Sequence, residues 1–173
     1  MFGVQKKLAR ASLALNGIIK TRQLHLSKSV KEFEGFDIEG LGTGLNGVSV
    51  TSGKEVYIIR CAIRHFTGNG VNLAGSTNAG HAFINDSSIA FNAGGVNVQG
   101  TANIASITNS SILSNMSFAV RANGASNIVG VQTSALDNGP TGISLLAGGA
   151  AISVGPSNLV TGAGAFSSTI LFK

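Results

Sequence analysis

ITNSSILSN, at residues 107–115, repeats with few changes the phrase INDSSIAFN at residues 84–92. Both phrases keep the same alternation of apolar and polar side chains. Self-similarity at a fixed period of 20 to 50 residues is typical of repeat architectures, in which each repeat packs on its neighbours. The phrase therefore predicts a solenoid, and its spacing gives the length of one coil.

Four apolar or serine columns recur in register along most of the chain. The first column is Ile38, Ile63, Ile89, Ile112, Leu136 and Leu159. Two residues before these positions lie Phe36, Cys61, Ser87, Ser110, Ser134 and Ser157, and five before lie Phe33, Ile58, Ile84, Ile107, Val131 and Val154. A fourth column, mostly preceded by glycine, is Val48, Val71, Val96, Val120, Ile143 and Phe166. Stacked coils would turn these columns into internal ladders of like side chains, with an inward serine ladder among them.

Each repeat has room for three short strands and three turns. We therefore predict an all-β, right-handed parallel β-helix, a single-stranded solenoid of about 5–6 coils of 23–26 residues stacked at about 4.8 Å. A leucine-rich repeat needs L-x-x-L-x-L runs that the chain does not keep, and a β-sandwich would not hold columns at a fixed period. Glycines in segments such as 42–44 and 68–70 are expected to supply positive φ at the coil corners.

Composition agrees with strands and turns. Charged residues make up 11% of the 173 residues, too few for exposed helices, and 24 residues are glycine. The net charge of +5 is concentrated in residues 1–31, which hold seven basic and no acidic side chains, whereas the remainder is at −2. Because residues 32–173 carry no net positive charge and the chain has no Trp and one Tyr, we do not expect it to bind nucleic acid. Cys61 is the single cysteine, which rules out an internal disulfide and a cysteine-based metal site.

Residues 1–32 form a basic N-terminal segment, and residues 33–173 form the predicted β-helix. Val4, Leu8, Ala11, Leu15 and Ile18 share one helical face, which favours a helical cap on the solenoid. An irregular first coil is the related alternative, because LNGII at 15–19 echoes LNGVS at 45–49. A mitochondrial presequence, or a start inside a longer secreted protein, are the other interpretations. No secretory signal or membrane-spanning run is visible, so the default expectation is cytoplasmic.

Several phrases carry a family resemblance. FDIEGLGTGLNGVSV at 36–50, CAIRHFTGNGVNL at 61–73 and SSIAFNAGGVNVQG at 87–100 resemble bacterial right-handed parallel β-helix repeat proteins of the pectate-lyase-like superfamily. The resemblance covers most of residues 33–173 and implies the fold. It does not imply one activity, because that superfamily includes lyases, hydrolases, epimerases, phage tailspikes and proteins without known activity.

The catalytic groups of those enzymes are not found in this sequence. Pectate lyases gather several carboxylates around calcium with an arginine base, and polygalacturonases combine aspartates from adjacent coils with Gly-His-Gly and Arg-x-Lys. After residue 39 the only acids are Glu55, Asp86 and Asp137, Gly80-His81 is followed by Ala82, and no Arg-x-Lys occurs. We therefore expect no enzyme site, no metal site and no cofactor.

One polar patch is the candidate site. The columns place Glu39 beside Arg64, and Arg60 beside Asp86, on adjacent coils. The candidate ligand-binding residues are Glu39, Tyr57, Arg60, Arg64, His65 and Asp86. In a functional interpretation the arginines hold a sugar carboxylate, Tyr57 stacks on the ring, and His65 or Asp86 moves a proton. In the plainer interpretation, which the sequence favours, two cross-coil ion pairs lie on a solvated face.

Other polar residues are interpreted as structural. His25 and His81 are distant from acids in sequence, and Asn92 and Asn115 are expected to hydrogen-bond turn backbone. The sequence thus favours a non-catalytic solenoid that presents a face to a polysaccharide or protein partner, and it favours a monomer over an oligomer. The alternative is a polysaccharide lyase or glycoside hydrolase acting on an acidic polysaccharide.

Overall fold

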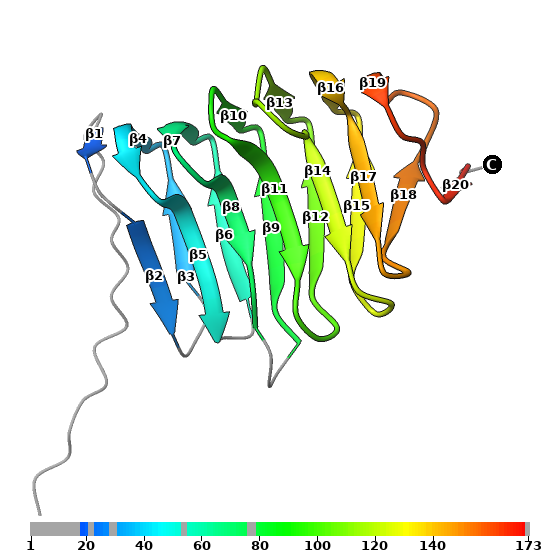
Figure 1. Ribbon diagram of the computed structural model, residues 1–173, viewed down its shortest axis with the longest axis horizontal. Helices are drawn as coiled ribbons and strands as arrows, with labels where there is room; N and C mark the ends of the chain where they lie inside the picture. The colour runs from blue at the N-terminus through cyan, green and yellow to red at the C-terminus, as the bar shows by residue number, and fades with distance from the viewer. Residues whose placement is uncertain (1–17, 21–22, 28–30, 53–54, 76–78, 172–173) are drawn as a thin grey trace, which may run out of the picture.

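The computed structural model describes residues 18–20, 23–27, 31–52, 55–75 and 79–171, and these residues form strands and turns without any helix. The strands assemble into three parallel sheets, which are stacked as a β-solenoid of about five turns (Figure 1). The predicted all-β parallel solenoid is confirmed. Among the described residues no helix could cross a membrane.

The sheets take one strand from each coil in turn. Sheet A contains β1 (Ile18–Lys20), β4 (Asp37–Gly44), β7 (Ala62–Phe66), β10 (Ser88–Ala90), β13 (Ser111–Leu113), β16 (Ala135–Thr141) and β19 (Leu159–Ala163). Sheet B contains β2 (Gln23–Ser27), β5 (Asn46–Ser52), β8 (Asn69–Leu73), β11 (Gly94–Gln99), β14 (Val120–Asn123) and β17 (Ile143–Leu146). Sheet C contains β3 (Lys31–Glu34), β6 (Glu55–Ile59), β9 (His81–Asn85), β12 (Ile104–Thr108), β15 (Ile128–Gln132), β18 (Ala150–Val154) and β20 (Ser168–Ile170).

The chain runs from sheet A to sheet B to sheet C in each coil and then begins the next coil. In Figure 1 it descends through sheet B on the near side and returns through sheet C on the far side while advancing from left to right, which is a right-handed winding. Right-handed crossovers are the rule between parallel strands, because they match the strand twist.

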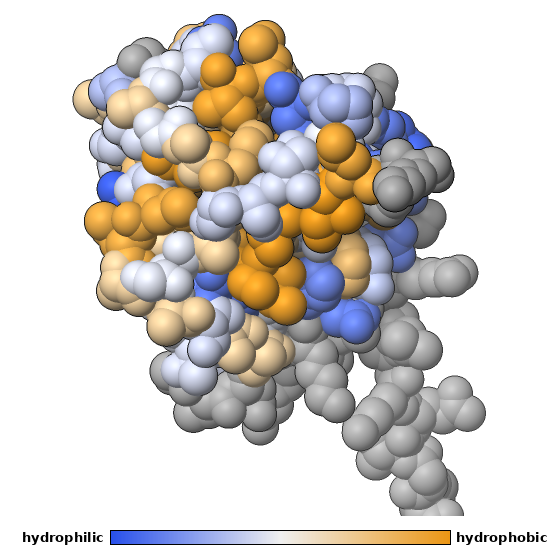
Figure 2. Space-filling view, turned by 90° about the vertical axis from the view of Figure 1, so that its right-hand side faces the viewer, coloured by the Kyte–Doolittle hydropathy of each residue, from blue (hydrophilic) through white to orange (hydrophobic). Residues whose placement is uncertain are grey.

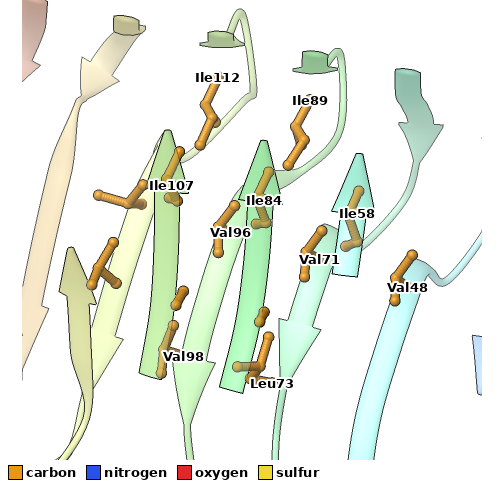
Figure 3. Packing of buried hydrophobic residues seen from close by; sticks show 14 of the residues in the cluster. Val48, Ile58, Val71, Leu73, Ile84, Ile89, Val96, Val98, Ile107 and Ile112 are labelled. Atoms are coloured by element: carbon orange, nitrogen blue, oxygen red, sulfur yellow. The ribbon is translucent and has the colours of Figure 1, made fainter. Parts of the chain in front are cut away.

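The apolar columns lie inside the solenoid as stacks (Figure 3). Register pairs join Ile63, Ile89, Ile112 and Leu136 in sheet A, and each of these side chains is 0% exposed. The column that begins with Val48 runs through Val71, Val96 and Val120 to Ile143 in sheet B. A third stack in sheet C is Ile58, Ile84, Ile107 and Val131. Like side chains on successive coils therefore fill the core at strand spacing.

The predicted columns are wrong in the last coil. Leu136 pairs with Val160 and not with Leu159, which is 60% exposed. Val131 pairs with Ser153 and not with Val154, and Phe166 lies outside the strands, partly buried against the core. The residues that join the stacks are Ser153, one before the predicted Val154, and Val160, one after the predicted Leu159. The two extra residues lie in the turn between β18 and β19, which has four residues, whereas the corresponding turn between β15 and β16 has two. Because strand side chains alternate in and out, a shift of one residue in either strand exchanges the buried and exposed positions.

Hydrogen-bonded ladders run beside the apolar stacks. The backbone N–H groups of Cys61, Ser87 and Ser110 donate to the hydroxyls of Ser87, Ser110 and Ser134, each at 3.1 Å. This confirms the serine ladder, except that Asn158 takes the place predicted for Ser157 by accepting from the Ser134 N–H at 2.9 Å. These bonds satisfy turn backbone that would otherwise be buried without partners.

The predicted asparagine contacts are confirmed. The Phe66 N–H donates to Asn92 Oδ1 at 3.0 Å, the Asn92 N–H to Asn115 Oδ1 at 3.1 Å, and the Asn115 N–H to Asn138 Oδ1 at 2.6 Å. A second ladder joins Asn103 and Asn127 in the turn before sheet C.

Glycine supplies positive φ at only some of the expected corners. Gly42 has a positive φ of 70°, but Gly68 and Gly70 do not. At the corner between sheets C and A, Gly35 and Gly155 have positive φ in the first and last coils, whereas Arg60, Asp86, Asn109 and Thr133, with φ between 47° and 52°, occupy it in the four coils between.

The start of the described chain contributes strands. β1, β2 and β3 pair with β4, β5 and β6 respectively. Ile18 lies in β1 of sheet A, whereas the LNGVS segment contributes to sheet B, so the echo between 15–19 and 45–49 is not a structural register. Val4, Leu8, Ala11 and Leu15, on which the helical cap was predicted, lie outside the described residues.

Candidate functional site

A shallow, widely open groove follows the corner between sheets C and A. Its volume is about 590 Å³, and four successive coils line it. At each coil the strand of sheet C ends, one residue adopts positive φ, the next side chain points inward into the serine ladder, and the following side chain points outward. This repeated turn places equivalent side chains in two parallel rows.

The two rows differ in size and polarity. Ala62, Ser88, Ser111 and Ala135, from β7, β10, β13 and β16, are half-buried and form a floor of small side chains. Arg60, Asp86, Asn109 and Thr133 stand at the exposed corner and form one wall. Strand spacing separates the first and last rungs by roughly 14 Å. The groove can therefore accept an extended chain that lies along the solenoid axis.

A polar cluster lies on the outer face of the early coils. The Arg64 guanidinium pairs with Asp37 and, through Nε at 3.0 Å, with Glu39. His65 Nδ1 lies 2.9 Å from Glu39 Oε1, and the His65 ring stacks on Phe91 with centroids 5.7 Å apart. Both carboxylates are therefore engaged by partners within the protein.

Electrostatics in this cluster favour an ionised Glu39. Burial alone would raise the pKa of this carboxyl, but hydrogen bonds from His65, from the Leu41 N–H and from Arg64 outweigh burial and lower the pKa below its ordinary value. A carboxylate held in this way is a poor general acid.

The structure separates the six predicted site residues into three groups. Glu39, Arg64 and His65 come together as the polar cluster, and the Glu39–Arg64 pair is confirmed. Arg60 and Asp86 occupy equivalent corner positions in the groove wall. The predicted Arg60–Asp86 ion pair is replaced, because Arg60 pairs with Glu34 on the preceding coil, while the Asp86 carboxylate accepts a hydrogen bond from the Asn85 amide at 2.9 Å.

Tyr57 lies on another face. It projects from β6 of sheet C, where its ring stacks on Phe83 with centroids 4.7 Å apart. Its hydroxyl donates to Glu55 at 3.1 Å, and this bond raises the pKa of the phenol. Because Phe83 covers one face of the ring and the groove lies elsewhere, Tyr57 does not join the arginines in one site.

His81 is held among neighbours. Its ring contacts Phe83 with centroids 3.9 Å apart, and its Nε2 lies 2.9 Å from Ser106 Oγ. Burial lowers the pKa of the imidazole. These contacts agree with the structural role predicted for this residue. The side chain of His25 lies outside what the structure describes.

Sequence reasoning missed most of the groove. The signal was present in the serine doublets at 87–88 and 110–111, whose second members point outward while the first point into the ladder. Asn109 and Thr133 follow the same columns as Arg60 and Asp86 but carry no charge, so a search for charged residues did not select them. Glu34 and Asp37, the partners of the two arginines, were missed for a different reason: the search paired each arginine with a single acid.

Chemically reactive groups are few around the groove. In the part of the chain that the structure describes, no three His, Cys, Asp or Glu side chains lie together in an arrangement that could hold a metal ion. Cys61 is buried beneath the groove floor, and burial raises the pKa of its thiol. A raised thiol pKa disfavours the nucleophilic thiolate.

Comparison with family models, with curated proteins and with solved structures found no match for this chain. The β-solenoid fold therefore stands on the structure itself, and the relationship to the pectate-lyase-like superfamily stays an inference from the sequence resemblance.

Proposed function

We propose that the protein is a non-catalytic β-solenoid that binds an extended polysaccharide along the groove between sheets C and A. The observation that carries the proposal is the groove itself, with its floor of small side chains and its polar wall repeated over four coils. A polymer of similar units can make the same kind of contact at each rung.

The chemistry of the lining favours a glycan over a peptide. Hydroxyls of Ser88, Ser111 and Thr133 and the amide of Asn109 can donate to and accept from sugar hydroxyls. Peptide grooves usually offer apolar pockets for alternate side chains. The outward-facing side chains that line this groove are polar, charged or alanine.

The absence of paired acids in the lining supports a binding role over hydrolysis. Glycoside hydrolases place two carboxyl groups on either side of the scissile bond. Asp86 is the single acid among the lining residues, and Glu39, Asp37 and Glu34 are occupied by Arg64, His65 and Arg60. The alternative function, a lyase acting on an acidic polysaccharide, would depend on the single carboxylate of Asp86 beside Arg60.

A glycan array probed with the full chain tests the proposal. We expect signals for one class of linear polysaccharide, and we expect Ser111→Phe, which fills the middle of the groove floor, to reduce them at least tenfold. Ser144→Phe is the matched control, because Ser144 is half-buried on a strand of sheet B away from the groove.

Two results would contradict the proposal. An array without signals above background would remove the glycan as ligand. Unsaturated products or new reducing ends from polygalacturonate or alginate, with or without calcium, would replace binding by catalysis.

A further inference from the structure

Phe91 presents an aromatic ring to solvent at the turn between sheets A and B. It is 59% exposed, although the ring of His65 on the preceding coil stacks against it. Large exposed apolar side chains also occur at the end of the solenoid, where hydrophobic residues lie among hydrophilic ones (Figure 2). Phe91 differs from those residues because it lies in a middle coil, three residues after Ser88 of the groove floor.

The fold itself does not require phenylalanine at this position. Phe91 has a φ of 56°, and the equivalent turn residues His65 and Ser114 have φ of 58° and 51°. Positive φ disfavours bulky side chains and suits asparagine or glycine. An exposed ring also gains little from burial. A side chain that the backbone disfavours and the core does not use is therefore a candidate for ligand contact.

A small apolar subsite lies beside the Phe91 ring. His65 stacks from the preceding coil, so the opposite face of the ring looks toward the next coil. There Ser114 occupies the equivalent turn position, between the half-buried Leu113 and Met116, which is 78% exposed. Strand pairing and a backbone hydrogen bond place these residues one strand spacing from Phe91. We call Phe91, Leu113, Ser114 and Met116 the Phe91 subsite.

The Phe91 subsite suits one sugar ring. The face of an aromatic ring carries partial negative charge, so it attracts the polarised C–H groups on the face of a pyranose. The exposed hydroxyl of Ser114 can donate to and accept from a sugar hydroxyl. This combination of an aromatic face and a hydroxyl recognises a sugar better than a purely apolar group.

The Phe91 subsite adjoins the groove across the width of sheet A. Ser111 of the groove floor and Leu113 lie on the same outer face of β13. Three residues of extended chain, roughly 10 Å, separate Ser111 from Ser114. A straight polymer along the groove does not cross this width. A sugar that branches sideways from the polymer does.

The charges near these positions favour neutral sugars. Asn109 and Ser111, on the coil that reaches the Phe91 subsite, carry no charge. In the groove wall, Arg60 is paired with Glu34, and Asp86 is the single acid of the lining. An acidic backbone would find no unpaired arginine among these residues.

We propose that the Phe91 subsite binds a neutral sugar branch of a polysaccharide whose backbone lies in the groove. This inference rests on the proposed function and adds the substrate class, a branched polysaccharide of neutral sugars.

Calorimetry of the full chain with matched linear and branched oligosaccharides tests the Phe91 subsite. One pair is cellotetraose and the xyloglucan heptasaccharide built on it, and the other is mannopentaose and its galactosylated form. In the pair that the groove binds, the wild-type chain should bind the branched member roughly tenfold more tightly, by stacking on Phe91. Phe91→Asn should bind both members equally, with the affinity that wild type has for the linear one.

The stability of the variants separates ligand contact from folding. Asparagine adopts positive φ more readily than phenylalanine, so Phe91→Asn should melt at the same temperature as wild type or higher. Leu41→Asn is the matched control. Leu41 is also 59% exposed and has a φ of 54°, but it lies two coils before Phe91, on the side that His65 covers. This variant should keep the preference for the branched oligosaccharide.

Met116 provides a local readout. The chain has two methionines, so labelling their methyl groups with carbon-13 gives one signal at the Phe91 subsite and a second from Met1 as reference. The Met116 signal, assigned with Met116→Leu, should shift when the branched oligosaccharide is added and stay in place with the linear one.

The outcomes distinguish the Phe91 subsite from the groove. Equal affinity for linear and branched members, an undiminished preference in Phe91→Asn, or an unmoved Met116 signal would overturn the subsite and leave groove binding intact. Failure of both pairs, while other glycans bind on the array, would do the same. An array without any signal would overturn the groove and the subsite together.

Discussion

Glu39 is the residue whose surroundings say most about the polar cluster. It accepts from the Leu41 N–H at 3.0 Å, from His65 Nδ1 at 2.9 Å and from Arg64 Nε at 3.0 Å. A side chain with this many internal partners has little capacity left for a ligand. At the residue scale, the polar cluster, which the sequence suggested as a sugar site, is better explained as a set of contacts that stabilises the stacking of the coils containing β4 and β7.

The lowered pKa of Glu39 predicts how stability depends on pH. The folded protein binds a proton at Glu39 less readily than the unfolded chain does, so Glu39 contributes stability above its ordinary pKa of 4.5 and loses it as pH falls through the lower folded value. Glu39→Gln should destabilise the protein near neutral pH, and this difference from wild type should shrink well below pH 4.5. Urea unfolding at both pH values checks it, and a difference that grows on acidification would contradict the assignment.

Glycines near the start of the sheet B strands allow the strands of neighbouring coils to lie close together. Gly47, Gly70 and Gly95 precede the valine column without positive φ. A Cβ added to Gly70 would lie 2.3 Å from Ile89 Cγ2, and one added to Gly95 would lie 2.1 Å from the Ala119 carbonyl oxygen. The glycines noted in the sequence therefore permit close approach of neighbouring coils.

Two glycine substitutions test this element-scale explanation. Gly95→Ala should lower the free energy of unfolding by about 1–3 kcal/mol, because β11 and β14 must move apart. Gly130→Ala is the control in β15, since its added Cβ would meet nothing closer than 3.9 Å, and it should be neutral or stabilise by up to about 1 kcal/mol. Denaturant unfolding measures both. Equal effects in the two variants would mean that close approach is not what requires Gly95.

Strands and their register were largely predictable, and the exceptions have physical causes. Period and alternation placed Ile63, Ile89 and Ile112 in one stack because each coil has nearly the same length. They failed at Leu159 because the turn before β19 is longer. Column adjacency predicted the Glu39–Arg64 contact, but it could not decide whether Arg60 reaches back to Glu34 or forward toward Asp86, since both coils are one strand spacing away.

At the scale of the whole molecule, the groove exists only because coils stack. No single repeat contains it, since each contributes one floor residue and one wall residue, and the four rungs from Arg60 to Thr133 combine them into a trough along the axis. This explains why a search for a local motif did not find it. It also predicts that ligand affinity is distributed along the trough and not concentrated at one point.

Affinity as a function of oligosaccharide length tests this central claim most directly. Titration calorimetry would use a length series of the glycan class that the array identifies, with Ser111→Phe as the groove-filled reference. Affinity should rise with each added sugar until the ligand spans the rungs from Arg60 to Thr133, and then level off, while the variant should lose the dependence on length. An affinity that is already complete with one or two sugars, or that is equal in wild type and Ser111→Phe, would contradict an extended groove as the binding site.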